Sequence, residues 1–395
     1  MTSPTLFTQE FWNNPHPVYA ALRQEAPVHP VTLPNGMEIW IVTRYSDCKA
    51  ALADPRLSKR QGAGDNARAL AAPVRSPLTH HLLANDPPDH TRLRRLVAKV
   101  FTARRVEDLR PRIGELSAAL IEPLRGKDSA DLVEEYAVHL PIQVICELLG
   151  VPIEDQADFR HWTSVMVSVS ASAGGAGAAE AAAAFVGYLL RLIERKRAAP
   201  AGDLLSALIA TRDEEDRLSE DELTSMAFLL LLAGHETTVN LIGNGMYTLL
   251  TLPDAHRRLR EDPSLIPAAV EEFLRLESPV ETATSRTAME PVTYGGVTIP
   301  AGAMVAISLL SADRDPDRFP APDEFDLGRP DNQHLAFGYG IHYCLGAPLA
   351  RLEAQIAFID LLAAFPDIRL AVPPSEVMWR PGTLIHGTVA LPVLL

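Results

Sequence analysis

The sequence predicts a mainly α-helical fold with a small β region. Long segments repeat apolar residues at the spacing of a helix face, whereas only a few short runs combine β-branched residues with flanking turn residues. Of the 395 residues, 47% are hydrophobic and 22% are charged, which is typical of a globular protein and excludes a disordered or fibrous one. No repeat or compositional boundary divides the chain, so we expect one domain over residues 1–395.

The β region is expected from two pairs of short runs and a fifth run that follows the second pair. A Pro-Asn-Gly turn separates the first pair and a Gly-Gly turn the second, and both turns favour an antiparallel return of the chain. The predicted strands are 28–32, 39–43, 292–294, 297–299 and 304–310.

Most of the remaining chain is expected to be helical. The continuous apolar run 226–233 is too short to cross a bilayer, so we expect it to lie in a buried helix. Three irregular stretches are interpreted as a substrate-contact loop (57–85), a joint between helices (170–184) and an ordered meander (313–330). The predicted helices are 17–25, 91–101, 106–124, 140–149, 156–167, 179–196, 204–211, 219–250, 266–276 and 347–364.

Charge and cysteine content limit the partners and the compartment. The 36 Lys and Arg residues against 50 Asp and Glu residues give a net charge of −14, which disfavours general binding to nucleic acid or to an anionic membrane. The three cysteines lie far apart and form no CxxC pair, which excludes a disulfide framework and a Cys-rich zinc module. The N-terminus has no pattern of a signal peptide, so we expect a cytoplasmic protein.

The strongest chemical motif is FGYGIHYCLGAPLAR at residues 337–351, in which three glycines crowd Cys344. Glycine allows the backbone to approach a flat ligand closely. The helix that begins near Ala347 directs free N–H groups at the cysteine sulfur, and these groups favour the thiolate over the thiol. The alternative for Cys344 is a small buried hydrophobic residue, which is what we expect of Cys48 and Cys146.

The motif resembles the haem-binding signature of the cytochrome P450 family, FGxGxHxCxGxxLAR, at every fixed position. The resemblance implies the helical triangular prism of that family, with haem b (iron protoporphyrin IX) as the cofactor. It makes Cys344 the metal ligand. It also places Phe337, Gly338 and Gly346 at the haem.

A second motif, AGHETT at 233–238, lies in the long apolar helix. Ala233, Gly234 and Thr237 share one face, so we expect a small-residue notch beside a hydroxyl. The string is similar to the oxygen-activating helix of the same family. The resemblance places Ala233 at the haem and makes Thr237 and Glu236 the catalytic candidates, with Thr237 bonded to dioxygen and Glu236 leading to a solvent proton path. For Thr237 the alternative is a hydroxyl bonded to the i−4 carbonyl. We expect His235 to be a packed or hydrogen-bonded helix residue, and a haem-ligating histidine is its alternative.

Two further patterns match the family. Glu272 and Arg275 form an ExxR pair, which the resemblance joins to Arg329 of the FDLGR string as structural support beneath the cysteine loop. One departure is Asp313, where Asn is more frequent, and we expect little consequence from it.

The basic segment after residue 86 supplies candidate anion ligands. His90 and Arg94 lie four residues apart on one helix face, and the resemblance directs them, with Arg286 and His342, at the haem carboxylates. The alternative for each is a solvated surface charge. Residues 91–105 carry six basic residues and no acid, for which we favour docking of an acidic ferredoxin over a solvated face.

Taken together, the resemblance implies a monomeric monooxygenase of secondary metabolism. It would insert one oxygen atom of O2 into a C–H or C=C bond of a lipophilic small molecule such as a macrolide or other polyketide, a steroid or a terpenoid. Ferredoxin and a ferredoxin reductase would supply electrons from NAD(P)H. The alternative is a haem-binding sensor or electron carrier that oxidises no substrate. Expected pocket residues include 280–284 and 384–385, besides the irregular stretches above.

Overall fold

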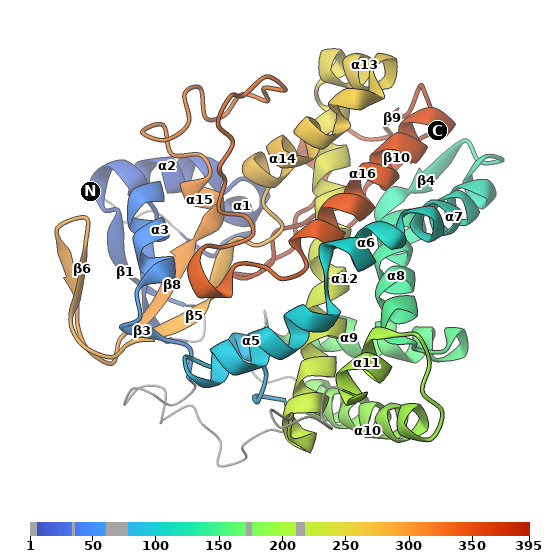
Figure 1. Ribbon diagram of the computed structural model, residues 1–395. Coiled ribbons are helices and arrows are strands. Elements are labelled where there is room, and N and C mark those ends of the chain that lie inside the picture. The colour runs from blue at the N-terminus through green and yellow to red at the C-terminus, as the bar shows by residue number, and fades with distance from the viewer. Residues whose placement is uncertain (1–5, 34–35, 61–77, 171–175, 211–217) are drawn as a thin grey trace.

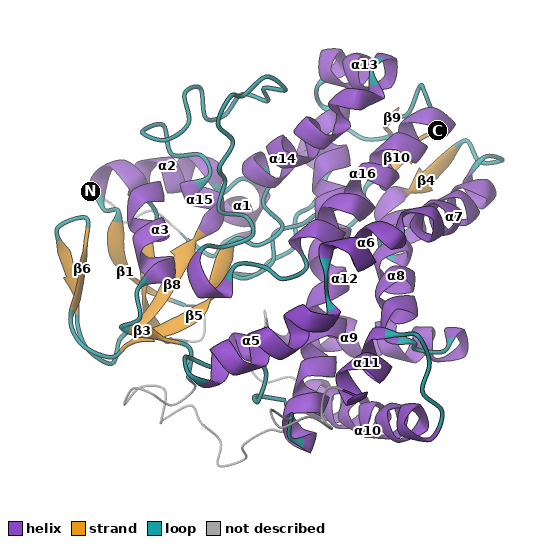
Figure 2. Ribbon diagram, in the orientation of Figure 1, coloured by secondary structure: helices purple, strands orange, loops and turns teal. Residues whose placement is uncertain are grey.

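The computed structural model describes residues 6–33, 36–60, 78–170, 176–210 and 218–395. A large helical region lies beside a smaller region that holds most of the strands (Figures 1 and 2). The expectation of a mainly helical fold with a small β region is therefore confirmed.

A five-stranded sheet forms the core of the smaller region. Its strand order is β1-β2-β8-β5-β3, and all neighbours are antiparallel except the parallel pair β2 and β8. Its strands are β1 (Val28–Thr32), β2 (Glu38–Val42), β3 (Leu57–Ser58), β5 (Thr282–Ala288) and β8 (Met304–Ser308). Beside it lie α1 (Gln9–Asn13), α2 (His16–Glu25), α3 (Tyr45–Ala53), α15 (Leu309–Ala312) and the hairpin of β6 (Val292–Tyr294) and β7 (Val297–Ile299).

The helical region is built around α12 (Glu220–Leu250), which runs through its middle (Figure 1). A capping box of Ser219 and Glu222 begins this helix. The other helices are α5 (Asp89–Val100), α6 (Ala103–Asp108), α7 (Arg110–Ile121), α8 (His139–Leu149), α9 (Gln156–Ser170), α10 (Ala176–Ala198), α11 (Leu204–Ala210), α13 (Pro253–Glu261), α14 (Ile266–Leu276) and α16 (Ala347–Ala364).

Short helical turns and a second sheet complete the described chain. The turns are η1 (Leu82–Ala84), η2 (Glu122–Leu124), η3 (Val133–Ala137), η4 (Ile153–Asp155), η6 (Pro263–Leu265), η7 (Gly340–His342) and η8 (Pro374–Glu376). The second sheet has the strand order β4 (Ser129–Asp131), β10 (Pro392–Leu394) and β9 (Arg369–Leu370), so it pairs the C-terminus with a mid-chain segment.

By length and composition, α12 is the one helix in the described ranges that could cross a membrane. However, 61% of its apolar window is buried inside the fold. It is therefore the buried core helix that the sequence predicts.

Two predicted elements have different bounds in the structure. The segment 106–124 is not one helix, because the chain breaks after α6 and Pro111 starts α7 in its first turn. The strand predicted at 304–310 ends at Ser308, whose hydroxyl accepts the N–H of Ser311 and caps α15. Of the predicted irregular stretches, residues 61–77 and 171–175 lie outside the described residues.

Candidate active site

Cys344 ends a loop that leads directly into α16. Gly338 (φ 72°) and Gly340 (φ 75°) are both in the left-handed region, and a Cβ on Gly340 would lie 3.3 Å from the Cα of Ala53. The N–H of Cys344 donates to the carbonyl of Phe337 at 2.9 Å and closes the loop. The backbone conformation therefore favours glycine at both positions, and at Gly340 the close approach of α3 favours it as well.

Of the three cysteines, Cys344 is exposed, whereas Cys48 and Cys146 are buried, as the sequence predicts. Protein surrounds the Cys344 sulfur on its other sides. This burial raises the pKa of the Cys344 thiol, and the N–H groups of Gly346 and Ala347 act in the opposite direction. The N–H groups therefore stabilise the thiolate as expected, but burial has the larger effect and favours the thiol. A metal cation bound to the sulfur would lower the pKa and favour the thiolate.

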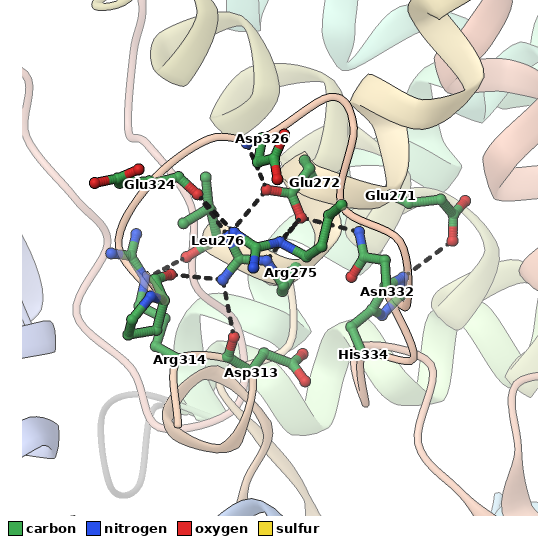
Figure 3. A network of polar contacts seen from close by, with 12 residues as sticks. Glu271, Glu272, Arg275, Leu276, Asp313, Arg314, Glu324, Asp326, Asn332 and His334 are labelled. Atoms are coloured by element: carbon green, nitrogen blue, oxygen red, sulfur yellow. Dashed lines mark hydrogen bonds and ion pairs between the residues drawn. The ribbon is translucent and has the colours of Figure 1, made fainter. Parts of the chain in front are cut away.

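A buried ion network joins α14 to the segment that precedes the Cys344 loop (Figure 3). Glu272 and Arg275 are both almost fully buried and lie 2.7 Å apart, and Glu272 also accepts from Arg329 at 3.0 Å and from Asn332 at 3.0 Å. Arg275 donates to the carbonyls of Asp313, Pro322 and Glu324. The predicted union of ExxR with Arg329 is confirmed.

A second ion cluster ties this network to the start of α16. Glu271 accepts two hydrogen bonds from Arg351, at 2.7 and 2.8 Å, and lies 3.1 Å from His334. The Arg351 guanidinium also lies 4.5 Å from the centre of the Phe337 ring. Glu271 was not predicted from the sequence, although its position next to Glu272 of the ExxR pair could have indicated a similar ion pair.

One side of α12 is accessible in the middle of the helix. Leu229, Leu230, Ala233 and Thr237 follow one another at helical spacing and are partly or fully exposed, whereas 223–228 and 238–246 are buried. Leu229, Leu230 and Leu345 of the cysteine loop pack against the same core cluster. The accessible side of α12 and the Cys344 loop therefore border the same core cluster.

The small-residue notch is narrower than the sequence predicts. A Cβ on Gly234 would lie only 2.9 Å from Cδ1 of Ile145, so this glycine admits α8 rather than a ligand. Ala233 alone provides the exposed small surface. The Thr237 hydroxyl donates to the Ala233 carbonyl at 3.0 Å, which is the i−4 alternative.

The neighbours of Thr237 contact other parts of the chain. His235 is buried, with Nδ1 2.9 Å from the Leu231 carbonyl, as a packed helix residue would be. Glu236 lies 3.6 Å from His235 and 3.7 Å from Arg380 of the C-terminal segment. The contact with Arg380 is not foreseen from the sequence.

The four predicted carboxylate ligands gather near the cysteine loop. The rings of His90 and His342 lie 4.3 Å apart, and Arg94 donates to the carbonyl of Tyr343 at 2.8 Å. Arg286 is buried and donates to the carbonyls at the end of α3. Burial, His90 and the surrounding cations lower the pKa of His342 to about 3.

Several of these polar atoms are buried without a partner in the described residues. They are both ring nitrogens of His90, Nδ1 of His342 and Nε of Arg286. Buried donors of this kind are normally satisfied, so their convergence indicates a bound anion. Together with one accessible cysteine and the accessible side of α12, this donor set fits a haem with carboxylate groups.

Exposed basic residues lie on the same helix as Arg94 and on the next one. Arg95, Lys99, Arg104 and Arg105 are exposed on α5 and α6, whereas Arg92 is paired with Glu222. A cavity of about 280 Å³, lined by Tyr343 and Arg351 among others, lies at the Cys344 loop itself. The predicted charge cluster therefore lies beside the Cys344 loop, which Arg94 contacts.

The predicted pocket segments are placed as follows. Residues 282–284 lie in β5, and Leu384 is exposed while Ile385 is partly buried. Val280 and Ile385 form an isolated β-bridge, so these two segments are side by side.

Comparison with known proteins gives consistent matches over nearly the whole chain. A family model described as Cytochrome P450 matches residues 175–376. The vitamin D(3) 25-hydroxylase of Pseudonocardia autotrophica is 50% identical over 393 residues, covering 99% of this chain and 96% of that protein. The cytochrome P450 monooxygenase PikC of Streptomyces venezuelae is 50% identical over 388 residues, covering 98% and 92%. The solved structure of the tirandamycin C-bound P450 monooxygenase TamI matches with a TM-score of 0.91 and 48% identity, covering 98% and 99%.

Proposed function

The chain belongs to the cytochrome P450 family and is a monooxygenase, and from this premise we propose which residues perform the reaction and on which substrates. The residues that bear on the proposal come from segments far apart in the sequence. The whole chain, 1–395, acts as one domain.

Cys344 is the thiolate ligand of a haem b iron. When bound, a thiolate-ligated haem supplies the reductive activation of dioxygen and the cleavage of its O–O bond. Phe337, Gly338, Gly346 and Ala233 contact the porphyrin. His90, Arg94, Arg286 and His342 hold its carboxylates. The buried nitrogens of His90, His342 and Arg286 that have no partner support a cofactor with free carboxylates rather than an uncharged porphyrin.

Thr237 and Glu236 deliver protons on the α12 side. The Thr237 hydroxyl, which donates to the Ala233 carbonyl, would be the proton donor on the α12 side of a bound haem. Glu236, between His235 and Arg380, passes protons from the C-terminal surface. Overall, the substrate gains one oxygen atom of O2, and the other atom leaves as water with two protons and two electrons.

The substrate is a lipophilic small molecule of the polyketide, steroid or terpenoid class. Leu229, Leu230 and Ala233 on the accessible side of α12 are apolar, and pockets for such ligands are mostly apolar with few polar groups. One relative is named for vitamin D(3), and another was solved with tirandamycin C. A binding screen of the holoprotein with macrolides, steroids and terpenes should give a shift in haem spin state with members of one class.

The electrons come from NAD(P)H through a ferredoxin reductase and an acidic ferredoxin that docks on α5 and α6. The exposed cations of these helices, within a chain of net charge −14, support this partner. The enzyme acts as a monomer in the cytoplasm.

The observation that carries the proposal is that Cys344 alone among the cysteines is accessible, with two N–H groups directed at its sulfur. Replacing Cys344 by His should abolish the thiolate-type spectrum of the reduced carbon monoxide complex, whereas the control Cys146→Ala should retain it. A colourless wild-type protein, or an unchanged spectrum in Cys344→His, would contradict the proposal.

A further inference from the structure

The chain between η8 and β10 contacts a polar stripe on α12. Glu236, Asn240 and Asn244 follow one another at intervals of four residues, so they share one face of that helix. The Asn244 amide donates to the carbonyl of His386 at 2.9 Å, and the Asn240 side chain leaves no room for a Cβ on Gly387. The backbone of this C-terminal chain is therefore fixed against α12 at two positions of the stripe.

Arg380 lies at the third position of the stripe. Its N–H donates to the carbonyl of Gly387 at 2.9 Å, and its neighbour Trp379 forms an isolated β-bridge with Thr388. Its guanidinium Nη1 lies 3.7 Å from Oε2 of Glu236. Because the backbone of Arg380 is paired with chain that packs on α12, the fold itself places this cation beside Glu236.

The Glu236 carboxylate lies between a buried group and one that reaches solvent. Its Oε1 is 3.6 Å from Nε2 of His235, whose side chain is only 2% exposed. On the other side, the exposed fraction of the side chain rises from 13% for Glu236 to 33% for Arg380. Solvent water therefore reaches these three side chains most readily at Arg380.

We propose that Arg380 is a positioning residue for proton delivery, which holds the Glu236 carboxylate toward the C-terminal surface and sets how readily it takes up a proton. This inference rests on the proposed function, because it requires Glu236 and Thr237 to deliver protons. The proton passes from solvent water to Glu236 and then replaces the one that the Thr237 hydroxyl donates.

The charge of Arg380, not a hydrogen bond, is what acts on Glu236. At 3.7 Å the two groups are beyond hydrogen-bond distance, so the carboxylate can turn away from Arg380 without breaking such a bond. A nearby cation favours the ionised form of a carboxyl group. Removing that cation should therefore let Glu236 keep its proton to a higher pH.

The test compares Arg380→Met, which removes the charge, with Arg380→Lys, which keeps it. Arg369→Met is the control, because Arg369 is an exposed arginine of the same C-terminal region, on β9. The measurement is product formed per NAD(P)H consumed by the holoprotein, as a function of pH. In Arg380→Met the pH above which this ratio falls should rise by about one unit, whereas Arg380→Lys and Arg369→Met should follow wild type.

A second measurement needs no turnover. The thermal midpoint of the full-length holoprotein is compared for wild type, Arg380→Met, Glu236→Gln and the double variant at neutral pH. Arg380→Met should lower the midpoint by about 1 °C more in the wild-type background than in Glu236→Gln, because only the first loses an attraction between charges.

Two results would overturn the inference. Arg380→Met could reduce the ratio of product to NAD(P)H by the same factor at every pH, or its effect on the midpoint could be the same with and without the Glu236 charge. Either result would make Arg380 a packing residue of the C-terminal chain. If Thr237→Ala still diverts electrons to peroxide, the proposed function stands and only this inference fails, whereas unchanged coupling in Thr237→Ala removes the proton path on which both depend.

Discussion

Asp313 is a buried acid at the base of the Cys344 loop. One of its oxygens accepts the N–H of Leu335 at 2.6 Å, whereas Oδ2 has no partner in the described residues. Burial raises the pKa of Asp313 to about 7. An Asn at this position would avoid the cost of ionising a buried carboxyl, and the expectation of little consequence from Asp313 stays a prediction.

Thr237→Ala is predicted to separate cofactor binding from oxygen chemistry. The change removes the hydroxyl that donates to the Ala233 carbonyl and leaves the packing of α12 otherwise intact. We expect normal haem content and an unchanged reduced carbon monoxide spectrum. Product formed per NAD(P)H consumed should fall by about tenfold or more, with hydrogen peroxide in its place.

Thr237→Ser is the matched control for that measurement, because it keeps the hydroxyl and should retain most of the coupling. Unchanged coupling in Thr237→Ala would remove this residue from proton delivery and leave only its helix-internal bond.

The part of the site that lies in continuous motifs could be predicted from the sequence. Cys344, Thr237 and the Glu272–Arg275 pair each lie in a short string that resembles a motif of the cytochrome P450 family. Arg380 could not be found in this way, because its partner Glu236 is 144 positions away along the chain. Pairings at such separations are set by the fold and leave no local pattern.

Helices and strands, too, could be predicted only where the local sequence carries a pattern. The helices α14 and α16 match the prediction at both ends, because each has a long apolar repeat and a Pro in its first turn. The strand β5, with the sequence TATSRTA, is polar and lacks alternation, so its neighbours β8 and β3 define it as a strand. The strands β1, β2 and β8 could therefore be predicted from the sequence, but not β5 and β3, which complete the sheet.

The exposed basic residues of α5 and α6 are predicted to control electron transfer. Lys99→Glu combined with Arg104→Glu reverses two charges on the docking face without touching the contact of Arg94 with Tyr343. We expect the KM for ferredoxin to rise about tenfold at low ionic strength and the difference to shrink at high salt, because screening weakens exposed charges.

Arg257→Glu on α13 is the control, since α13 lies at the other end of the molecule (Figure 1). Haem spectra and turnover with an artificial reductant should be unchanged in both variants. An equal effect of the two variants, or a difference that does not depend on salt, would contradict docking on α5 and α6.

At the scale of the whole molecule, Glu277 joins parts of the chain that are remote in sequence. Its carboxylate lies 3.0 Å from His16 of α2, 2.8 Å from Arg314 and 2.8 Å from His386 near the C-terminus. The His386 ring stacks on Trp379 at 4.2 Å, and its backbone carbonyl accepts from Asn244 of α12 at 2.9 Å. One buried acid thus connects the N-terminal helices, the core helix and the C-terminal segment.

Glu277→Gln is predicted to lower the free energy of unfolding by about 3–5 kcal/mol near neutral pH, because it leaves the Arg314 guanidinium buried without its charged partner. Although burial opposes ionisation, His16 and Arg314 hold the pKa of Glu277 well below its usual range. The stabilisation is therefore fully present above the unfolded-state pKa of about 4.3 and is lost as the pH falls below it.

Denaturant unfolding should show the full difference from wild type at neutral pH and a smaller one in acid, whereas the exposed control Glu290→Gln should change little at either pH. A difference that stays constant down to acid pH would mean that Glu277 stabilises the fold by packing and neutral hydrogen bonds, not by its charge.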